Sequence, residues 1–103
     1  MSIDYNPQAT VDIDDAARSI AVDLSPAMAT AFLHRLTDTL VGLEAFPHSG
    51  SPVDPPYPNC PGMRCRAVKK FTARVVYYVP TPTGIRVVRV LHAHQDTAGA
   101  FGD

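Results

Sequence analysis

The sequence predicts an α+β fold in the order β-α-α-β-β-β, in which a helical hairpin packs on one face of a small, mainly antiparallel four-stranded sheet. Two patterns predict it. Apolar side chains recur at three- and four-residue spacing in the first half of the chain, as in amphipathic helices, and alternate with polar ones in the second half, as in half-buried strands. The 103 residues suffice for one modest core, so we expect residues 1–103 to form a single domain.

The first half predicts a short strand and two helices that pair as an antiparallel hairpin. Residues 3–5 are the strand. A polar residue followed by proline is a common start of a helix, and this signal occurs at Asn6-Pro7 and again at Ser25-Pro26. The second helix is predicted to end near residue 47, where the next proline stands.

Both helices carry an apolar stripe that predicts which side faces the sheet. In the first helix the stripe is Ala9, Ile13, Ala16, Ala17, Ile20 and Leu24, whereas the residues expected to face water are Asp12, Asp14, Asp15 and Arg18. In the second helix the stripe is broader and comprises Met28, Phe32, Leu33, Leu36, Leu40 and Leu43.

Residues 47–62 form a proline-rich segment between the helices and the later strands. Six prolines and two glycines among these sixteen residues argue against any regular helix or strand. A loop of this length is either a solvated connection or a functional element, and the sequence leaves both interpretations open.

The second half predicts three strands of an antiparallel meander. Residues 63–67 alternate apolar and basic side chains, residues 72–79 are rich in β-branched and aromatic types, and a Pro/Thr/Gly turn precedes a strand over residues 85–92. Residues 97–103 are expected to be a tail that adds little to the core. Because the hairpin covers one face of the sheet, the opposite face is predicted to be open and either polar or covered by a partner.

Charge divides the chain into an acidic and a basic part. Residues 1–59 hold eight acidic and two basic side chains, whereas residues 60–103 hold seven basic and two acidic ones. The basic set is Arg64, Arg66, Lys69, Lys70, Arg74, Arg86 and Arg89. A solvated basic face and a binding surface for an anionic partner both explain this pattern.

The composition argues against several classes of protein. The chain has no apolar run long enough to span a bilayer and no signal-peptide pattern at its start, so we expect a cytoplasmic location and no membrane partner. Cys60 and Cys65 are too few for a disulfide framework or a zinc site. We therefore expect neither a metal nor a cofactor.

Several short motifs, in order, resemble the RelE/ParE toxins of type II toxin–antitoxin systems. The similarity spans residues 3–96, and the element order is also that of this family. The motifs are the FPHSG segment at 46–50, PGMR at 61–64, ARVVYY at 73–78, and RVLH at 89–92 with the preceding Val88 and the later Asp96. The resemblance implies a growth-inhibiting toxin that a cognate antitoxin holds inactive by wrapping around it with a segment that folds on binding.

The family has two branches, and the RelE-like branch consists of ribosome-dependent ribonucleases that act on mRNA. Their chemistry needs a base, an acid and cations that stabilise the phosphorane. By resemblance, Arg64, Arg66 and Arg74 match the catalytic cations on the strands, and the candidate catalytic set is completed by His92 and His94. No Tyr or Arg follows Leu91, so the usual C-terminal residues of these ribonucleases are missing. The two histidines are possible replacements if the last strand continues far enough to place them on one face.

The C-terminal motif favours the ParE-like branch, which is associated with inhibition of DNA gyrase and needs no catalytic residue. A ParD-like antitoxin is then the expected partner. Such an inhibitor needs an exposed surface, and guanidinium groups are suited to binding carboxylates or phosphates there. The candidate partner-binding residues are Arg64, Arg66, Arg74, Tyr78, Arg86, Arg89 and His92.

Two of these candidates depend on which way a strand faces. Ala73, Val75, Tyr77 and Val79 form the more apolar set, so Tyr77 is predicted to enter the core and Tyr78 to lie beside Arg74 on the open face. Arg89 is either a surface residue or a buried structural partner of Asp96 or of a helix acid. The sequence does not decide between these two roles.

Three hypotheses of function follow. The first is a gyrase-inhibiting toxin neutralised by an antitoxin, and the second is a ribosome-dependent mRNA interferase. The third is a relative that has lost toxicity and only binds an antitoxin, which the slightly acidic pI of 6.4 motivates.

Overall fold

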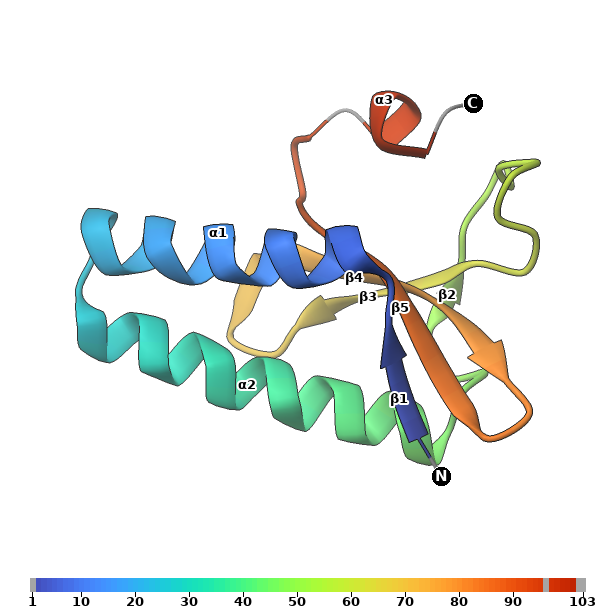
Figure 1. Cartoon of the computed structure of the whole chain (residues 1–103), viewed down its shortest axis with the longest axis horizontal. Coiled ribbons are helices and arrows are strands. Elements are labelled where there is room, and N and C mark those ends of the chain that lie inside the picture. Colours follow the sequence, from blue (N-terminus) through green and yellow to red (C-terminus); the bar gives the residue numbers. More distant parts are fainter. Residues whose placement is uncertain (1, 96, 102–103) are drawn as a thin grey trace.

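The computed structural model describes residues 2–95 and 97–101 and contains five strands and three helices in this part of the chain (Figure 1). The elements follow the predicted order, with one short strand and one short helix in addition. They are β1 (Ser2–Tyr5), α1 (Pro7–Asp23), α2 (Pro26–Ala45), β2 (Ser51–Pro52), β3 (Arg64–Val68), β4 (Phe71–Thr81), β5 (Gly84–His92) and α3 (Thr97–Phe101).

The strands form one sheet in the order β1-β5-β4-β3-β2, and α1 and α2 lie together across one of its faces (Figure 1). Only β1 and β5 pair in parallel. The predicted α+β fold with its hairpin is therefore confirmed, but the sheet has five strands rather than four.

The extra strand β2 lies inside the proline-rich segment that was predicted to contain no strand. Ser51 pairs with Cys65, and Pro52 pairs with Arg64, at the outer edge of the sheet. An edge strand needs no hydrogen-bond donor on its outer side, so proline is tolerated there. Tertiary pairing therefore overrides a local composition that disfavours strands.

The two predicted helix starts differ in how they are capped. Ser25 Oγ accepts a hydrogen bond from the backbone N–H of Met28 at 3.1 Å, which satisfies one of the free donors at the start of α2. Asn6 makes no such side-chain bond, and α1 begins with the preset backbone of Pro7 instead. Within the described residues, none of the helices has the length and apolar character needed to cross a membrane.

The main core fills the space between the helical hairpin and the sheet. Phe32 of α2 meets Phe71 of β4 edge to face, with ring centroids 5.5 Å apart. The predicted stripe residues Leu24 and Met28 are instead exposed, because that end of the hairpin reaches past the edge of the sheet (Figure 1). The largest fully buried side chains of this core are Phe32, Leu43, Val68, Val76, Tyr78, Ile85 and Val87.

The opposite face of the sheet is not open, which corrects the prediction. The proline-rich segment and α3 fold over it and build a second apolar cluster. Its buried members are Met63, Val79, Val88, Leu91 and Phe101, and its partly buried members are Val53, Tyr57, Cys60, Tyr77 and Ala100.

Phe101 joins the C-terminal segment to this second cluster. Its ring lies 5.2 Å from that of Tyr57 and 5.1 Å from that of Tyr77, measured between centroids. The Tyr57 and Thr97 hydroxyls are also hydrogen-bonded at 2.8 Å. The prediction that the C-terminal tail adds little to the core is therefore wrong for residues 97–101, because the ring of Phe101 packs in the second cluster.

We expect Phe101→Ala to lower the free energy of unfolding by about 2–4 kcal/mol, because it leaves a cavity between two tyrosine rings. Phe46→Ala is the matched control. Phe46 is 71% exposed, so its truncation should change stability by no more than about 0.5 kcal/mol. Urea denaturation of both variants measures the difference, and equal midpoints would contradict this account of α3.

Candidate functional surface

Arg64 and Arg66 of β3 bind the main chain of the segment that follows α2. Arg64 Nη1 donates to the carbonyl oxygens of His48 at 3.0 Å and Gly50 at 2.7 Å. Arg66 Nη2 donates to the Ser49 carbonyl at 2.8 Å. Three successive carbonyls are thus held by two guanidinium groups, whose planar arrays of donors suit such multiple contacts. Two candidate site residues therefore have a structural role in this loop.

Tyr78 completes the same arrangement from inside the core. Its hydroxyl donates to the Pro47 carbonyl at 2.7 Å and accepts from the Gly50 N–H at 2.9 Å. Gly50 packs directly on the tyrosine ring, where a larger residue would collide with it. Burial raises the pKa of Tyr78, although the bond from Gly50 partly offsets this. Tyr78 is fully buried, so its predicted place on an open face is wrong.

The faces of β4 were predicted the wrong way round because both faces of the sheet are covered. Val76 and Tyr78 point into the main core, whereas Tyr77 and Val79 belong to the second cluster. An alternating pattern identifies the core side of a strand only when the other side meets water. The structure therefore places Tyr77 on the side away from the helices.

The cations of β3 and β4 lie on the helix side of the sheet, not on the opposite face as predicted. Directly paired residues on neighbouring strands point to the same side. Arg64 is paired with Tyr78, and Arg66 with Val76, which are both core residues beneath the helices. Arg74 lies on this side too, two residues before Val76.

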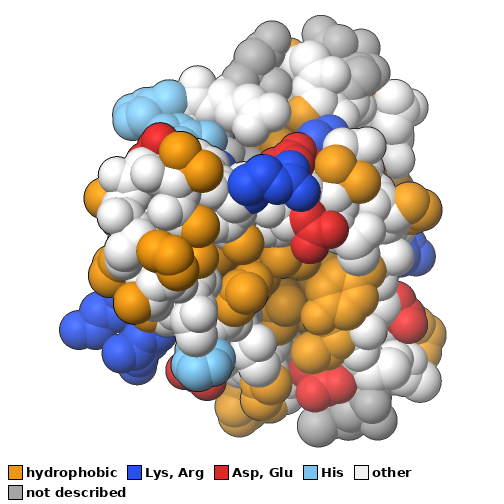
Figure 2. Space-filling model, turned by 60° about the vertical axis from the view of Figure 1, so that its left-hand side comes forward, with side chains coloured by type: hydrophobic (Ala, Val, Ile, Leu, Met, Phe, Trp, Pro, Cys, Tyr) orange, Lys and Arg blue, Asp and Glu red, His pale blue; other side chains and the backbone are white. Residues whose placement is uncertain are grey.

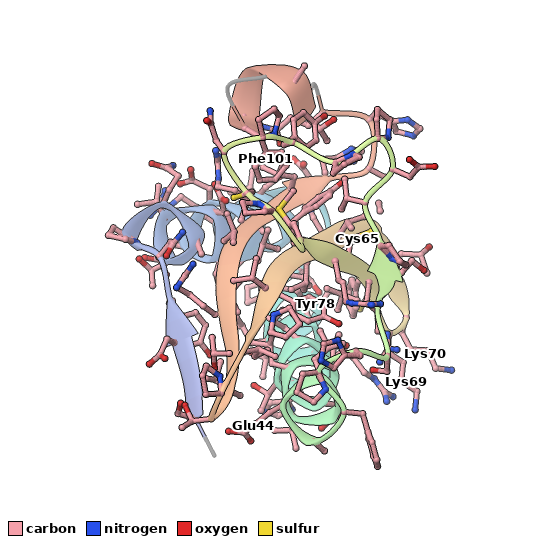
Figure 3. The ribbon with its side chains drawn as sticks, turned by 90° about the vertical axis from the view of Figure 1, so that its right-hand side faces the viewer. Glu44, Cys65, Lys69, Lys70, Tyr78 and Phe101 are labelled. Carbon is pink, nitrogen blue, oxygen red and sulfur yellow. The ribbon has the colours of Figure 1, made fainter. Side chains whose placement is uncertain are left out.

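Arg86 is separated from these cations. It is exposed and paired with Val79 of the second cluster, so it points to the other side of the sheet. The predicted basic set is thus divided between the two faces. Lys69 and Lys70 lie in the turn between β3 and β4, and Figure 3 shows them projecting away from the fold.

Arg89 is a structural residue, and its partner is the helix acid Asp12. Arg89 Nε and Nη2 donate to the two carboxylate oxygens at 2.7 and 3.0 Å. The Asp12 side chain is 8% exposed and that of Arg89 is 17% exposed. Hydrogen bonding to Asp12 raises the pKa of Arg89. The prediction that Asp12 faces water is wrong. Asp96, the other partner considered, lies outside the described residues.

Asp12 also closes an open edge of the sheet. β1 pairs with β5 only as far as Val87, so the later part of β5 has no strand on that side. The Val90 N–H donates to Asp12 Oδ2 at 3.0 Å, which replaces the missing strand acceptor. One carboxylate therefore binds the guanidinium group and the backbone of the same strand.

Arg74 and His92 form a pair at the other end of the sheet. They are opposite each other on β4 and β5 and line a pocket of about 230 Å³ beside the end of α1. The His94 backbone N–H donates to His92 Nδ1 at 3.2 Å. β5 ends at His92, so the condition for placing both histidines on one strand face is not met.

The structure reveals three residues with roles that the sequence analysis missed, namely Asp12, Gly50 and Phe101. Asp12 sits on the helix next to Ile13 of the apolar stripe, which was a signal that it lies near the core boundary. Gly50 and Phe101 gave no local signal, because their partners are far away along the chain. Gly50 packs on Tyr78, and Phe101 packs on Tyr57 and Tyr77. In the described part of the chain, no three His, Cys, Asp or Glu residues are grouped to hold a metal.

Comparison with known proteins assigns this chain to a class. Residues 3–97 match the profile of the family described as the ParE toxin of the type II toxin–antitoxin system, parDE. The chain thus belongs to the class of type II toxin–antitoxin toxins. Within that class it belongs to the ParE toxin family.

One solved structure shows the same fold at low sequence identity. It is described as the chromosomal ParDE TA system from P. aeruginosa and superimposes with a TM-score of 0.72 at 18% identity. The alignment covers 89% of this chain and 95% of that chain. Comparison with curated sequences gave no match.

We expect Asp12→Asn to destabilise the fold by about 2–4 kcal/mol, because it leaves a largely buried guanidinium group without its counter-charge. Asp15→Asn is the control. Asp15 pairs with Arg18 on the exposed side of α1, where such a pair contributes at most about 0.5 kcal/mol. Thermal unfolding at neutral pH compares the two, and equal losses would rule out a special role for Asp12.

We expect Tyr78→Phe to cost about 1–3 kcal/mol, because the Gly50 N–H and the Pro47 carbonyl both lose their partner. Tyr5→Phe, at a 43% exposed ring, should change stability little. The folded-state pKa of Tyr78 lies above the ordinary 10.0, so its contribution is complete below pH 10 and is lost as pH rises through the folded value. Urea titrations on both sides of pH 10 should show a steeper alkaline loss in the wild type than in Tyr78→Phe, and parallel losses would contradict this.

Proposed function

We propose that this protein inhibits DNA gyrase and that a ParD-like antitoxin neutralises it. The observation that carries the proposal is the match of residues 3–97 to the ParE toxin family. The solved relative is described as a ParDE system, which pairs such a toxin with an antitoxin. The mechanism proposed is occupation of a gyrase surface, which requires a stable surface and no covalent chemistry.

The contacts of the basic side chains favour an inhibitor over a ribonuclease. Arg64 and Arg66, two of the cations that a phosphorane would need, are engaged with loop carbonyls. Arg89 is engaged with Asp12. These side chains are positioned to maintain the shape of the surface. Arg74, Arg86 and His92 remain candidates for direct contact with gyrase.

A partly apolar hollow on the outer side of the helical hairpin favours a protein as the binding partner. Figure 2 shows hydrophobic side chains in a hollow between charged groups on this side of the molecule. A pocket of about 270 Å³ lies here between α1, α2 and β1. Exposed apolar surface of this kind marks protein interfaces. Tyr5 and Leu33, which line this pocket, are large apolar side chains that are 43% and 40% exposed.

We expect the purified protein to inhibit supercoiling of relaxed plasmid by purified gyrase, and the product of an adjacent antitoxin gene to restore it. Charge reversal at a contact residue should weaken inhibition, because it removes the guanidinium group that contacts the partner and places a negative charge there. Arg74→Glu and Arg86→Glu are the test variants. Arg18→Glu, on the exposed side of α1, is the charge-matched comparison. It should behave as the wild type if gyrase contacts the strands, and a loss of inhibition in this variant would assign the contact to the hairpin.

Two outcomes would contradict the proposal in different ways. Full supercoiling activity at a severalfold molar excess of folded protein would exclude gyrase as the target, and discrete mRNA cuts on induction would then indicate the interferase. Normal growth on expression without an antitoxin would indicate a binding protein that has lost toxicity.

A further inference from the structure

The pocket beside the end of α1 has an unusual mixture of apolar and polar walls. Ile20 and Leu24 of α1 and Phe71 of β4 supply apolar surface. Phe71 packs edge to face against the buried Phe32, which joins this wall to the main core. The polar lining residues are Ser19, Asp23, Arg74 and His92.

The size of the pocket argues for a side chain as its occupant. Its volume is about 230 Å³. Pockets for free small ligands commonly range from about 300 to 1,000 Å³. A single large side chain of another protein therefore fits this space better than a metabolite does.

The charges around the pocket argue against an anionic occupant. Arg74 makes no ion pair among the described residues. However, Asp23 lines the same pocket, and the C-terminal end of α1 carries the negative end of the helix dipole. A phosphate or a carboxylate placed here would be repelled by both, so the site suits a neutral group with polar edges.

The polar groups match the edges and faces of an aromatic side chain. A guanidinium group binds the face of an aromatic ring, most strongly that of tryptophan. Asp23 Oδ2 accepts from the Ser19 hydroxyl at 3.2 Å, which leaves Oδ1 to accept from an indole N–H or a phenol O–H. His92 Nδ1 is occupied by the His94 N–H, so the proton of the neutral ring is on Nε2, which can donate to a phenol oxygen.

We propose that this pocket receives a tryptophan or tyrosine side chain from a protein partner. The inference rests on the proposed function, which supplies a protein partner, and it deepens that function by naming the chemistry of one contact. Such aromatic residues commonly carry a large share of the binding energy at protein interfaces. The exposed rim at Leu24 extends the apolar contact outside the pocket.

The absence of tryptophan from the chain permits a direct test. The probe is N-acetyl-tryptophanamide, whose fluorescence is excited selectively, and the site is mapped by amide chemical shifts. We expect saturable binding with shifts centred on Ile20, Phe71 and Arg74. Arg74→Gln should weaken binding about three- to tenfold, because it removes the cation from the ring face. Arg18→Gln is the matched control and should bind within about twofold of the wild type.

A second variant keeps the inference falsifiable if Arg74→Gln affects folding. Ser19 lines the pocket from α1 and its hydroxyl reaches the lining residue Asp23, so the new ring of Ser19→Phe should fill the pocket and abolish probe binding in a protein that unfolds normally. Equal affinity of Arg74→Gln and wild type, or undiminished binding to Ser19→Phe, would overturn the proposal.

Two further probes separate the remaining occupants. N-acetyl-leucinamide should bind more weakly than the aromatic probe. Equal binding would show that the pocket has no preference for aromatic side chains and would overturn the proposal. Tighter, Arg74-dependent binding of adenosine monophosphate would assign it to a nucleotide base instead and overturn the proposal. None of these measurements uses gyrase or an antitoxin, so a failure of the proposed function would be detected separately.

Discussion

The fold depends most on the Asp12 carboxylate, because it joins the helical hairpin to the sheet where the sheet is incomplete. β1 is four residues long and ends beside Val87, while β5 continues to His92. Asp12 accepts the Val90 N–H that β1 does not reach and neutralises Arg89 on the same strand. A largely buried ion pair contributes little by itself, but here it also satisfies a backbone donor that would otherwise be unpaired.

A second constraint concerns the segment after α2, and it explains why the basic strand is not simply a charged surface. Tyr78 holds this segment from within the core, and Arg64 and Arg66 hold it from the neighbouring strand. The same side chains therefore determine both the path of the loop and the charge that it presents. A surface built in this way is preorganised, which lowers the entropic cost of binding a partner.

Covering both faces of the sheet leaves three kinds of surface for partners. The outer side of the hairpin has a partly apolar hollow between charged groups, the turn after β3 carries Lys69 and Lys70, and the end of α1 has a pocket with mixed walls (Figures 2 and 3). An inhibitor that binds an antitoxin and a target needs such separate or overlapping surfaces.

Much of the fold was predictable because helix and strand periodicities are local. Both helices, the three later strands and the Ser25 cap follow from residue types within a few positions of one another. The candidate site was less predictable. Tyr78 was assigned to the wrong face, since a strand covered on both sides has no distinguishing pattern. β2 and α3 were missed, since each is stabilised by pairing or ring contacts with distant residues.

The sequence by itself determined the order of the elements, the family, and the separation of acidic helices from basic strands. Only the tertiary structure decided what each charge does. Arg89 is neutralised by an acid 77 positions earlier, and Arg66 binds a carbonyl 17 positions earlier. Arg74 lines a pocket and makes no ion pair within the described part of the chain. The residue type is the same in each case. Its role depends on which groups the fold brings within hydrogen-bonding distance, and local sequence carries no information about those distances.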